Sequence, residues 1–246
     1  MMKVAAIIQA RMGSTRLPGK ILKKVLGKTL LEYQIERVKR SQQINQIIIA
    51  TTTKDSDDPI VQLCDQLSIP YYRGSEEDVL SRYYEAAKMF KVDVIVRLTS
   101  DCPIIDPAVI DKVIKHYLNN KDQFDYVSNT LVRTFPRGMD TEVLPIEILE
   151  NALLNSKEPV YREHVTSYIY HHPNLFKLGN VTHVEDLSHN RWTVDTEEDF
   201  QLIKNILNEL YPINTFFNMT DVLELMDKNP SWFKINSHVE QKKLSL

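Results

Sequence analysis

Short apolar runs alternate with amphipathic segments over about the first 130 residues of this 246-residue chain. The apolar runs predict strands at residues 4–8, 46–52, 69–73, 92–98 and 124–128. The amphipathic segments between them predict helices at residues 29–41, 57–67, 75–87 and 107–118. Because strands and helices that alternate in this way form a mostly parallel sheet covered by helices on both faces, we expect an α/β fold.

The pattern becomes less regular after residue 129. We expect a strand within residues 135–144, helices at 147–154 and 159–170, an extended segment at 176–184 and a short strand at 191–195. Two further helices are predicted at 197–210 and 221–227. The length fits a single domain, which we place at residues 1–236, followed by a polar tail at 237–246.

Composition excludes several classes of protein. The net charge is −3, although the first 40 residues hold ten lysines and arginines against two glutamates. This asymmetry favours a local anion site over a basic nucleic-acid-binding surface. No apolar run approaches the roughly 20 residues of a membrane span. The two cysteines, Cys64 and Cys102, offer neither a disulfide framework nor metal-ligand spacing. We therefore expect a cytoplasmic protein that does not insert into a membrane.

The loop after the first predicted strand combines glycines, hydroxyls and cations. Its glycines allow backbone N–H groups to converge on phosphate oxygens, and arginine and lysine complete such a shell. These residues are Arg11, Gly13, Ser14, Thr15, Arg16, Gly19 and Lys20. The loop matches neither G-x-x-x-x-G-K-[ST] nor G-x-G-x-x-G. Phosphate binding is the favoured interpretation, and a loop with ordinary solvated charges is the alternative.

Two aspartates follow predicted strands and are candidate metal ligands. Asp101 follows the strand at 92–98, and Asp195 ends the strand at 191–195. Mg²⁺ prefers one or two carboxylates together with substrate phosphates. Each aspartate also has an ordinary alternative role, in a turn for Asp101 and as a helix cap for Asp195. Cys102 is not a candidate nucleophile, since no histidine lies near it in the sequence.

Several segments together resemble the cytidylyltransferases that activate acidic sugars, the acylneuraminate and 3-deoxy-manno-octulosonate types. The segments resemble most the spore-coat polysaccharide biosynthesis branch of that family. They are Ile8-Gln-Ala-Arg-Met-Gly-Ser-Thr-Arg-Leu-Pro-Gly-Lys20, Arg73-Gly-Ser-Glu-Glu-Asp-Val-Leu-Ser-Arg-Tyr83, Arg97-Leu-Thr-Ser-Asp-Cys-Pro103, Arg162-Glu-His-Val-Thr166 and Arg191-Trp-Thr-Val-Asp-Thr-Glu-Glu-Asp199. The resemblance implies a nucleotide-diphosphosugar transferase-like fold and the transfer of CMP from CTP to a sugar acid, with release of pyrophosphate.

The resemblance also implies roles for individual residues. Lys20, Arg11 and Asp101 are expected to be catalytic, and Asp101 and Asp195 to bind Mg²⁺. The expected nucleotide-binding residues are Gln9, Ala10, Arg11, Gly13, Ser14, Arg16, Lys20, Arg73 and Thr99. The segment at about 130–185 is expected to form a small extended region for sugar contact and dimerisation in a homodimer. The expected sugar-binding residues are Arg137, Arg162, Glu163 and His164.

Two other functions stay open at the level of the sequence. A glycosyltransferase that uses a nucleotide sugar can share the layout and the metal, although many such enzymes carry an Asp-x-Asp pair that Ser100-Asp101-Cys102 lacks. A non-catalytic nucleotide-binding protein of glycan assembly is the other alternative. Release of pyrophosphate would distinguish a nucleotidyltransferase from both.

Overall fold

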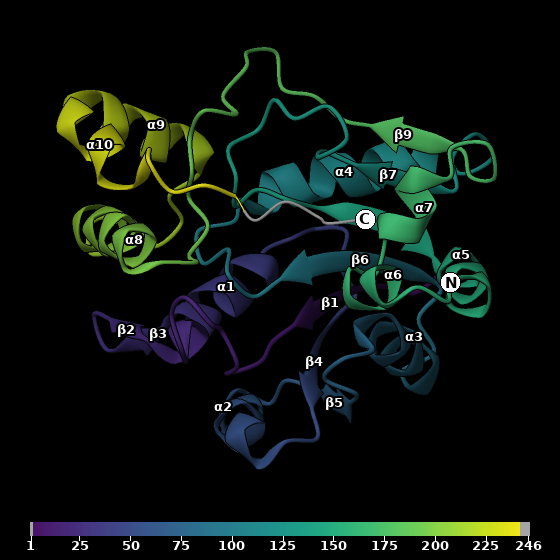
Figure 1. The fold of residues 1–246 in the computed structure, drawn as a ribbon. Coiled ribbons are helices and arrows are strands. Elements are labelled where there is room, and N and C mark those ends of the chain that lie inside the picture. The colour runs from purple at the N-terminus through teal and green to yellow at the C-terminus, as the bar shows by residue number, and fades with distance from the viewer. Residues whose placement is uncertain (1, 242–246) are drawn as a thin grey trace.

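The computed structural model describes residues 2–241, and its centre is a seven-stranded sheet (Figure 1). The strand order is β5-β4-β1-β6-β8-β7-β9, and β8 alone runs antiparallel to its neighbours. The strands are β1 (Val4–Gln9), β4 (Gln46–Thr52), β5 (Tyr71–Gly74), β6 (Val94–Thr99), β7 (Tyr126–Ser128), β8 (Glu142–Pro145) and β9 (Leu178–Asn180). A separate two-stranded hairpin pairs β2 (Lys24–Val25) with β3 (Lys28–Thr29). The predicted α/β fold with a mostly parallel sheet is confirmed.

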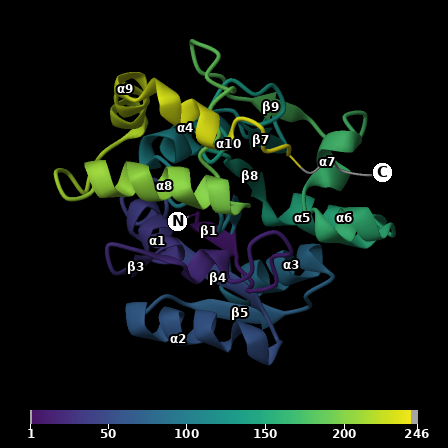
Figure 2. The same cartoon turned by 60° about the vertical axis from the view of Figure 1, so that its left-hand side comes forward.

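Helices cover both faces of the sheet because successive strand residues point to opposite sides. Ala6 and Ile8 face one buried cluster, which α1 (Leu30–Val38), α2 (Asp58–Leu67), α4 (Pro107–Asn119), α8 (Glu197–Leu210) and α9 (Met219–Lys228) complete. Ala5 and Ile7 face the other, which α3 (Val79–Met89), α5 (Ile146–Asn155) and α7 (Ser167–His171) complete. Figure 2 shows α2 beside the edge strand β5, and α9 and α10 (Phe233–Asn236) on the opposite side of the molecule.

Polar side chains cap the helices where the sequence changes from loop to apolar periodicity. Thr29 and Glu32 form a capping box at the start of α1, and Thr196 and Asp199 form another at α8. Asp106 caps α4 by accepting from the N–H of Ala108 at 2.8 Å. These assignments matter for the site, because neither Asp101 nor Asp195 is used as a helix cap.

Two expectations about the second half are wrong in detail. The helix predicted at 159–170 is two short helices, α6 (Pro159–Glu163) and α7, separated by a turn in which Val165 has a φ of 32°. Residues 191–195 form no strand and make only an isolated bridge between Arg191 and Arg137. Within 176–184, only β9 is a strand, and it pairs with β7 of the same chain. Short segments here are shaped by tertiary contacts more than by their own periodicity.

The last described elements are η3 (Pro230–Trp232) and α10. The predicted polar tail at 237–246 is described as far as residue 241, and residues 242–246 lie outside the described part. Within residues 2–241, none of the helices combines the length and the apolar character that crossing a membrane requires.

Candidate active site

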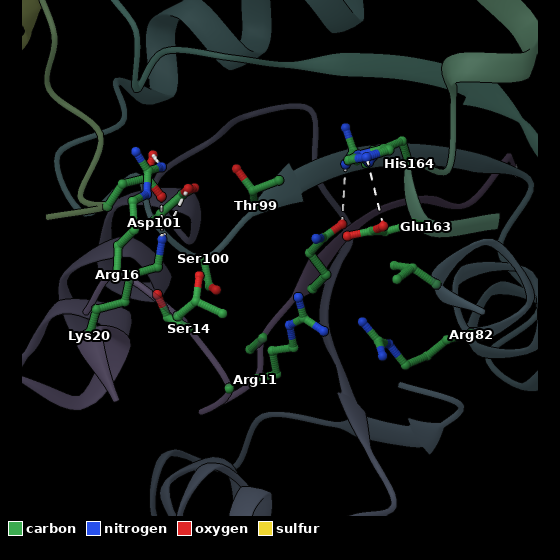
Figure 3. Close-up of a pocket in the computed structure, with 17 residues that line it drawn as sticks. Arg11, Ser14, Arg16, Lys20, Arg82, Thr99, Ser100, Asp101, Glu163 and His164 are labelled. Carbon is green, nitrogen blue, oxygen red and sulfur yellow. Dashed lines mark hydrogen bonds and ion pairs between the residues drawn. The ribbon is translucent and has the colours of Figure 1, made fainter. Parts of the chain in front are cut away.

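A cavity of about 300 Å³ opens at the carboxyl ends of β1 and β6, where open α/β sheets bind ligands. Figure 3 shows the side chains around it. Its lining comes from the loop after β1, the end of β6, α3, the turn after α6 and the segment before α8. The lining residues are Gln9, Ala10, Arg11, Gly13, Ser14, Thr15, Arg16, Lys20, Val79, Arg82, Arg97, Thr99, Ser100, Asp101, Glu163, His164 and Asp195.

The loop between residues 10 and 19 is held by contacts to its own backbone and to a buried carboxylate. Asp57, which is 2% exposed, accepts a hydrogen bond from the N–H of Met12 at 2.7 Å. The Met12 carbonyl in turn accepts from the N–H groups of Ser14 (2.8 Å) and Gly19 (3.1 Å). Gly19 has a φ of 66°, a left-handed conformation that favours glycine. The 3-10 turn η1 (Lys20–Leu22) follows at once, so Lys20 enters the cavity from a fixed backbone.

Lys20 lies between the two predicted metal carboxylates. Its Nζ is 2.8 Å from Oδ1 of Asp195 and 3.4 Å from Oδ2 of Asp101, and it donates to the Val194 carbonyl at 2.7 Å. Burial lowers the pKa of Lys20, but the two carboxylates outweigh this and raise it above its usual value. Burial alone would raise the pKa of Asp101, but the positive charge of Lys20 outweighs burial and lowers this pKa below its usual value. Lys20 and Asp101 are therefore both charged at neutral pH.

Tertiary contacts bring Asp195 to Asp101 across 94 positions of sequence. The N–H of Val194 donates to the Asp101 carbonyl at 2.8 Å, and the Thr193 hydroxyl donates to the same oxygen at 3.2 Å. The Asp195 carboxylate also pairs with Arg191 at 2.9 Å and with Arg16 at 3.0 Å. Three cations therefore surround this one carboxylate.

A fully buried aspartate orients the Arg191 side chain. Asp199 has no exposed surface, and its two oxygens accept from Nε and Nη2 of Arg191, each at 2.9 Å. Asp199 also accepts from the backbone N–H of Asp195 at 2.9 Å. The Asn236 amide donates to Asp199 at 2.8 Å and to the Arg191 carbonyl at 2.9 Å. This network leaves the Asp195 side chain directed at the cavity while Thr196 caps α8.

Most of the residues expected at the site line this one cavity. From the β1 loop and β6 these are Gln9, Ala10, Arg11, Gly13, Ser14, Arg16, Lys20, Thr99 and Asp101. From the second half of the chain they are Glu163, His164 and Asp195. Arg11 is half-exposed and lies 3.6 Å from a carboxylate oxygen of Glu76. Their roles in binding and catalysis stay predictions.

Three arginines expected at the site lie elsewhere. Arg73 turns towards α2, where it pairs with Asp58 at 2.7 Å and donates to the Thr52 carbonyl. Arg162 donates to the Leu153 carbonyl at 3.1 Å and lies 3.5 Å from Asp78, because α6 ends one residue later and turns Glu163 and His164 the other way.

Arg137 lines a different cavity of about 260 Å³. Its neighbours there include Arg191, Trp192 and residues of the C-terminal segment. The main chain holds it in place, since its N–H donates to the Asn190 carbonyl at 3.0 Å and its carbonyl accepts from the Trp192 N–H at 2.7 Å. Arg137 is therefore absent from the lining of the first cavity, and its expected role in sugar binding stays a prediction.

Several lining residues were not singled out by the sequence. These are Val79 and Arg82 on α3, Arg97 on β6, and the loop residue Ser100. Arg82 and Arg97 both lie within segments that resemble the family. Their spacing from the strand ends gave no reason to prefer them over Arg73. Arg97 pairs with Glu142 of β8 and donates to the Gln9 side chain at 3.2 Å.

The carboxylate oxygens of the cavity fit a hard cation whose remaining ligands come from a bound molecule. Among residues 2–241 there is no group of three or more histidine, cysteine, aspartate or glutamate side chains suited to a metal ion. Asp101 and Asp195, however, both lie within 3.4 Å of one ammonium nitrogen. Two carboxylates at one point match the protein share of a Mg²⁺ site completed by phosphate oxygens. Burial raises the pKa of Cys102 well above its usual value, so the neighbouring thiol adds no anionic ligand.

A second cavity of about 340 Å³ adjoins the first, and Arg97 and His164 line both. Two ion pairs form part of its wall. Arg133 binds Asp140 through two hydrogen bonds of 2.5 and 2.7 Å, and Arg97 pairs with Glu142. Thr130, Thr166 and Tyr170 add polar groups. The second cavity can thus offer hydrogen bonds to a polyhydroxylated molecule that reaches the first.

A basic, glycine-containing loop and two facing carboxylates at the strand ends of a parallel sheet define a nucleotide-binding α/β protein. The chain belongs to the cytidylyltransferase family, since the family model described as Cytidylyltransferase matches residues 5–226. The family resemblance inferred from the motifs is confirmed.

Individual relatives agree with this assignment. The chain is 33% identical over 231 residues to the spore coat polysaccharide biosynthesis protein SpsF of Bacillus subtilis. The aligned residues cover 91% of this chain and 94% of SpsF. It is 32% identical over 145 residues to a 3-deoxy-manno-octulosonate cytidylyltransferase of Chlamydia trachomatis. This alignment covers 57% of this chain and 55% of that enzyme. The solved structure of a cytidylyltransferase from Leptospira borgpetersenii superposes with a TM-score of 0.91 at 35% identity, and covers 99% of this chain and all of that one.

Proposed function

We propose that this protein transfers CMP from CTP to a hydroxyl group of a sugar acid and releases pyrophosphate, in the synthesis of a surface or spore-coat polysaccharide. The observation that carries the proposal is Lys20, which lies between Asp101 and Asp195 at the end of the basic loop. Family membership favours cytidylyl transfer over the glycosyltransferase and the non-catalytic alternatives. The sugar acid is suggested by the 3-deoxy-manno-octulosonate cytidylyltransferase, and the polysaccharide by SpsF.

The reaction needs alignment and charge neutralisation more than covalent help from the protein. The acceptor hydroxyl oxygen forms a bond to the α-phosphorus while the bond from that phosphorus to pyrophosphate breaks. Lys20, Arg16 and Arg11 line the same cavity and would bind the triphosphate. Their fixed charges would stabilise the transition state and the departing pyrophosphate. When nucleotide binds, Lys20 and Arg16 would exchange Asp195 for phosphate oxygens.

Mg²⁺ is part of the proposal as the expected cofactor. Asp101 and Asp195 would hold the ion together with the phosphates of CTP. The bound ion would neutralise phosphate charge and fix the position of the triphosphate.

The acceptor would occupy the second cavity, which Arg97 and His164 connect to the first. The ion pairs of Arg133 with Asp140 and of Arg97 with Glu142 would offer donors and acceptors to its hydroxyl and carboxyl groups. His164 lines both cavities and Glu163 lines the first, and both would contact the acceptor near its reacting hydroxyl. The expected homodimer and cytoplasmic location stay predictions of the sequence.

A screen for released pyrophosphate tests the proposed function. CTP, UTP, ATP and GTP are each incubated with a panel of sugar acids, with Mg²⁺ and with EDTA. We expect pyrophosphate from CTP with at least one sugar acid, only with the metal. The Asp101→Asn variant serves as a control for contaminating activity. In a parallel incubation with nucleotide sugars, release of a nucleoside mono- or diphosphate, with no pyrophosphate from any triphosphate, would instead identify a glycosyltransferase.

A further inference from the structure

Arg82 is a buried arginine, and none of the carboxylates in the described part of the chain pairs with it. It is 2% exposed, yet it lines the cavity described above. Its Nη1 donates to the Ser75 carbonyl at 2.6 Å, while Nε is buried without any hydrogen-bond partner. The other arginines of the cavity differ in this respect, since Arg11, Arg16 and Arg97 each pair with a carboxylate.

A charge in this environment is destabilising until something pairs with it. Burial lowers the pKa of Arg82 overall, and the nearby charge of Arg11 lowers it further, whereas Tyr83, Asp57 and Glu76 act in the opposite direction. Buried charges in proteins are normally paired or hydrogen-bonded. Because no side chain of residues 2–241 forms an ion pair with Arg82, a ligand in the cavity can supply acceptor atoms to its guanidinium group.

The surrounding structure fixes the direction of this side chain. Arg82 and Val79 are three residues apart on α3 and therefore share one face of the helix, the face that lines the cavity. The Arg82 stem passes Gly74 at the end of β5, where a Cβ would come within 3.1 Å of Cγ of Arg82. The absence of a side chain at Gly74 leaves room for the stem.

The position of Arg82 in the cavity indicates which part of a nucleotide it meets. Figure 3 shows Lys20, Arg16 and Asp101 on one side of the cavity and Arg82 on the other. Phosphates and their cation belong with Lys20 and the carboxylates, so the nucleoside extends towards Arg82. Ala10 and Val79 add apolar surface beside it. We propose that Arg82 donates hydrogen bonds to the base of the bound nucleotide and so makes this enzyme selective for cytosine.

The hydrogen-bond donors of a guanidinium group are complementary to the acceptors of cytosine. Cytosine presents two adjacent acceptors, O2 and N3, and arginine presents N–H donors in a planar fork. Uracil has an N–H group at position 3, which would face the guanidinium donor to donor. A site built around such donors rejects the analogue that leaves one of them unpaired. This inference depends on the proposed nucleotide site and adds the residue that selects the base.

Binding measurements test the assignment without turnover. Calorimetry compares cytidine, CMP, CTP and UTP for the wild type, Arg82→Met and Arg82→Lys, with Arg40→Met as a matched loss of one arginine outside the cavity. Losing charge-assisted hydrogen bonds should weaken cytidine, CMP and CTP alike, by about 10- to 100-fold. UTP should change by less than about threefold, so that discrimination between CTP and UTP disappears. Arg82→Lys should lose most of the affinity too, because a lysine ammonium cannot form the fork.

Two results would overturn the assignment to the base. Unchanged cytidine affinity in Arg82→Met, with circular dichroism showing a native fold, would mean that Arg82 does not contact the nucleoside. A loss that grows from cytidine to CTP, with affinity kept in Arg82→Lys, would mean that it binds phosphate instead. Arg73→Met is measured as well, since a loss there and none in Arg82→Met would favour the residue expected from the sequence.

The outcome separates this inference from the proposed function. A wild-type protein that binds cytidine through Arg82 but releases no pyrophosphate would contradict the proposed transfer and leave the role of Arg82 standing. Pyrophosphate release from CTP by an Arg82→Met enzyme that still rejects UTP would contradict the role of Arg82 alone.

Discussion

Replacing Lys20 by methionine should have opposite effects on turnover and on metal binding. The Lys20 ammonium occupies the point between Asp101 and Asp195, at 3.4 and 2.8 Å from their oxygens. A divalent cation that uses both carboxylates must displace it. Methionine has a similar length but no charge, so Lys20→Met should free the two carboxylates for the ion while it removes a cation from the phosphates.

The contacts give the size of each effect. Metal binding at the two carboxylates breaks the hydrogen bonds that Lys20 donates to them, a good one at 2.8 Å and a long one at 3.4 Å. At about 1.5–3 kcal/mol for a hydrogen bond to a charged group, the pair contributes roughly 3 kcal/mol, or about 100-fold in a binding constant. We therefore expect Lys20→Met to bind metal about 100-fold more tightly without nucleotide. Turnover should fall by roughly 100- to 1,000-fold, as when one preorganised electrostatic contact is lost.

Mn²⁺ binding without nucleotide, followed by electron paramagnetic resonance, measures the first effect, and pyrophosphate release measures the second. Lys23→Met is the matched control, because it removes the same charge from a side chain that pairs with the exposed Glu197 at 2.8 Å. It should change neither quantity appreciably. Equal Mn²⁺ affinity in the wild type and Lys20→Met would refute the idea that Lys20 holds the place of the ion. Normal turnover in Lys20→Met would remove it from the mechanism.

Asp101→Asn and Asp195→Asn should each abolish most activity and raise the Mg²⁺ requirement, and the double variant should be little worse than either single one, because residues that hold one ion act as a unit; fully multiplicative losses over a Mg²⁺ titration would contradict this. Burial raises the pKa of Glu36, but hydrogen bonds from Lys28 and Tyr211 lower it overall. Its stabilisation is therefore present above its unfolded pKa of about 4.3 and is lost as pH falls through the lower folded value. Urea unfolding at a series of acidic pH values should show a shallower loss for Glu36→Gln, and parallel curves would disprove the contribution. Light scattering should give a homodimer, and a monomer at high micromolar concentration would count against it.

Local signals were sufficient for most elements of the first half, for the helix at 197–210 and for the basic loop. The strand at 46–52 and the helix at 197–210 have the bounds that periodicity and caps predict. Buried runs and capping residues act within a few positions of themselves, so the sequence contains them completely. The same holds for residues 9–20, whose glycines, hydroxyls and cations are consecutive. Strand ends in a parallel sheet share one edge, which explains why the predicted positions of Asp101 and Lys20 converge.

The conformation of the segment at 191–195 could not be predicted from local sequence signals. It was expected as a strand, but backbone bonds to Asp101 and the Arg191–Asp199 pair hold it instead. Those partners lie tens of residues away or in the next helix, so the local periodicity of the sequence does not indicate them. Asp195 still reaches the cavity, for a reason other than the one that the sequence suggested.

Only the tertiary structure shows which of two neighbouring arginines, Arg73 or Arg82, faces the cavity. By itself the sequence determined the family, the order of strands and helices and the segment that contains both Arg73 and Arg82, but it did not show which of the two faces the cavity. Asp58 draws Arg73 towards α2, whereas the rotation of α3 and the open space at Gly74 direct Arg82 inwards. The direction of a side chain depends on how its helix or strand packs against elements far away in the chain, and that information exists only once the sheet has formed.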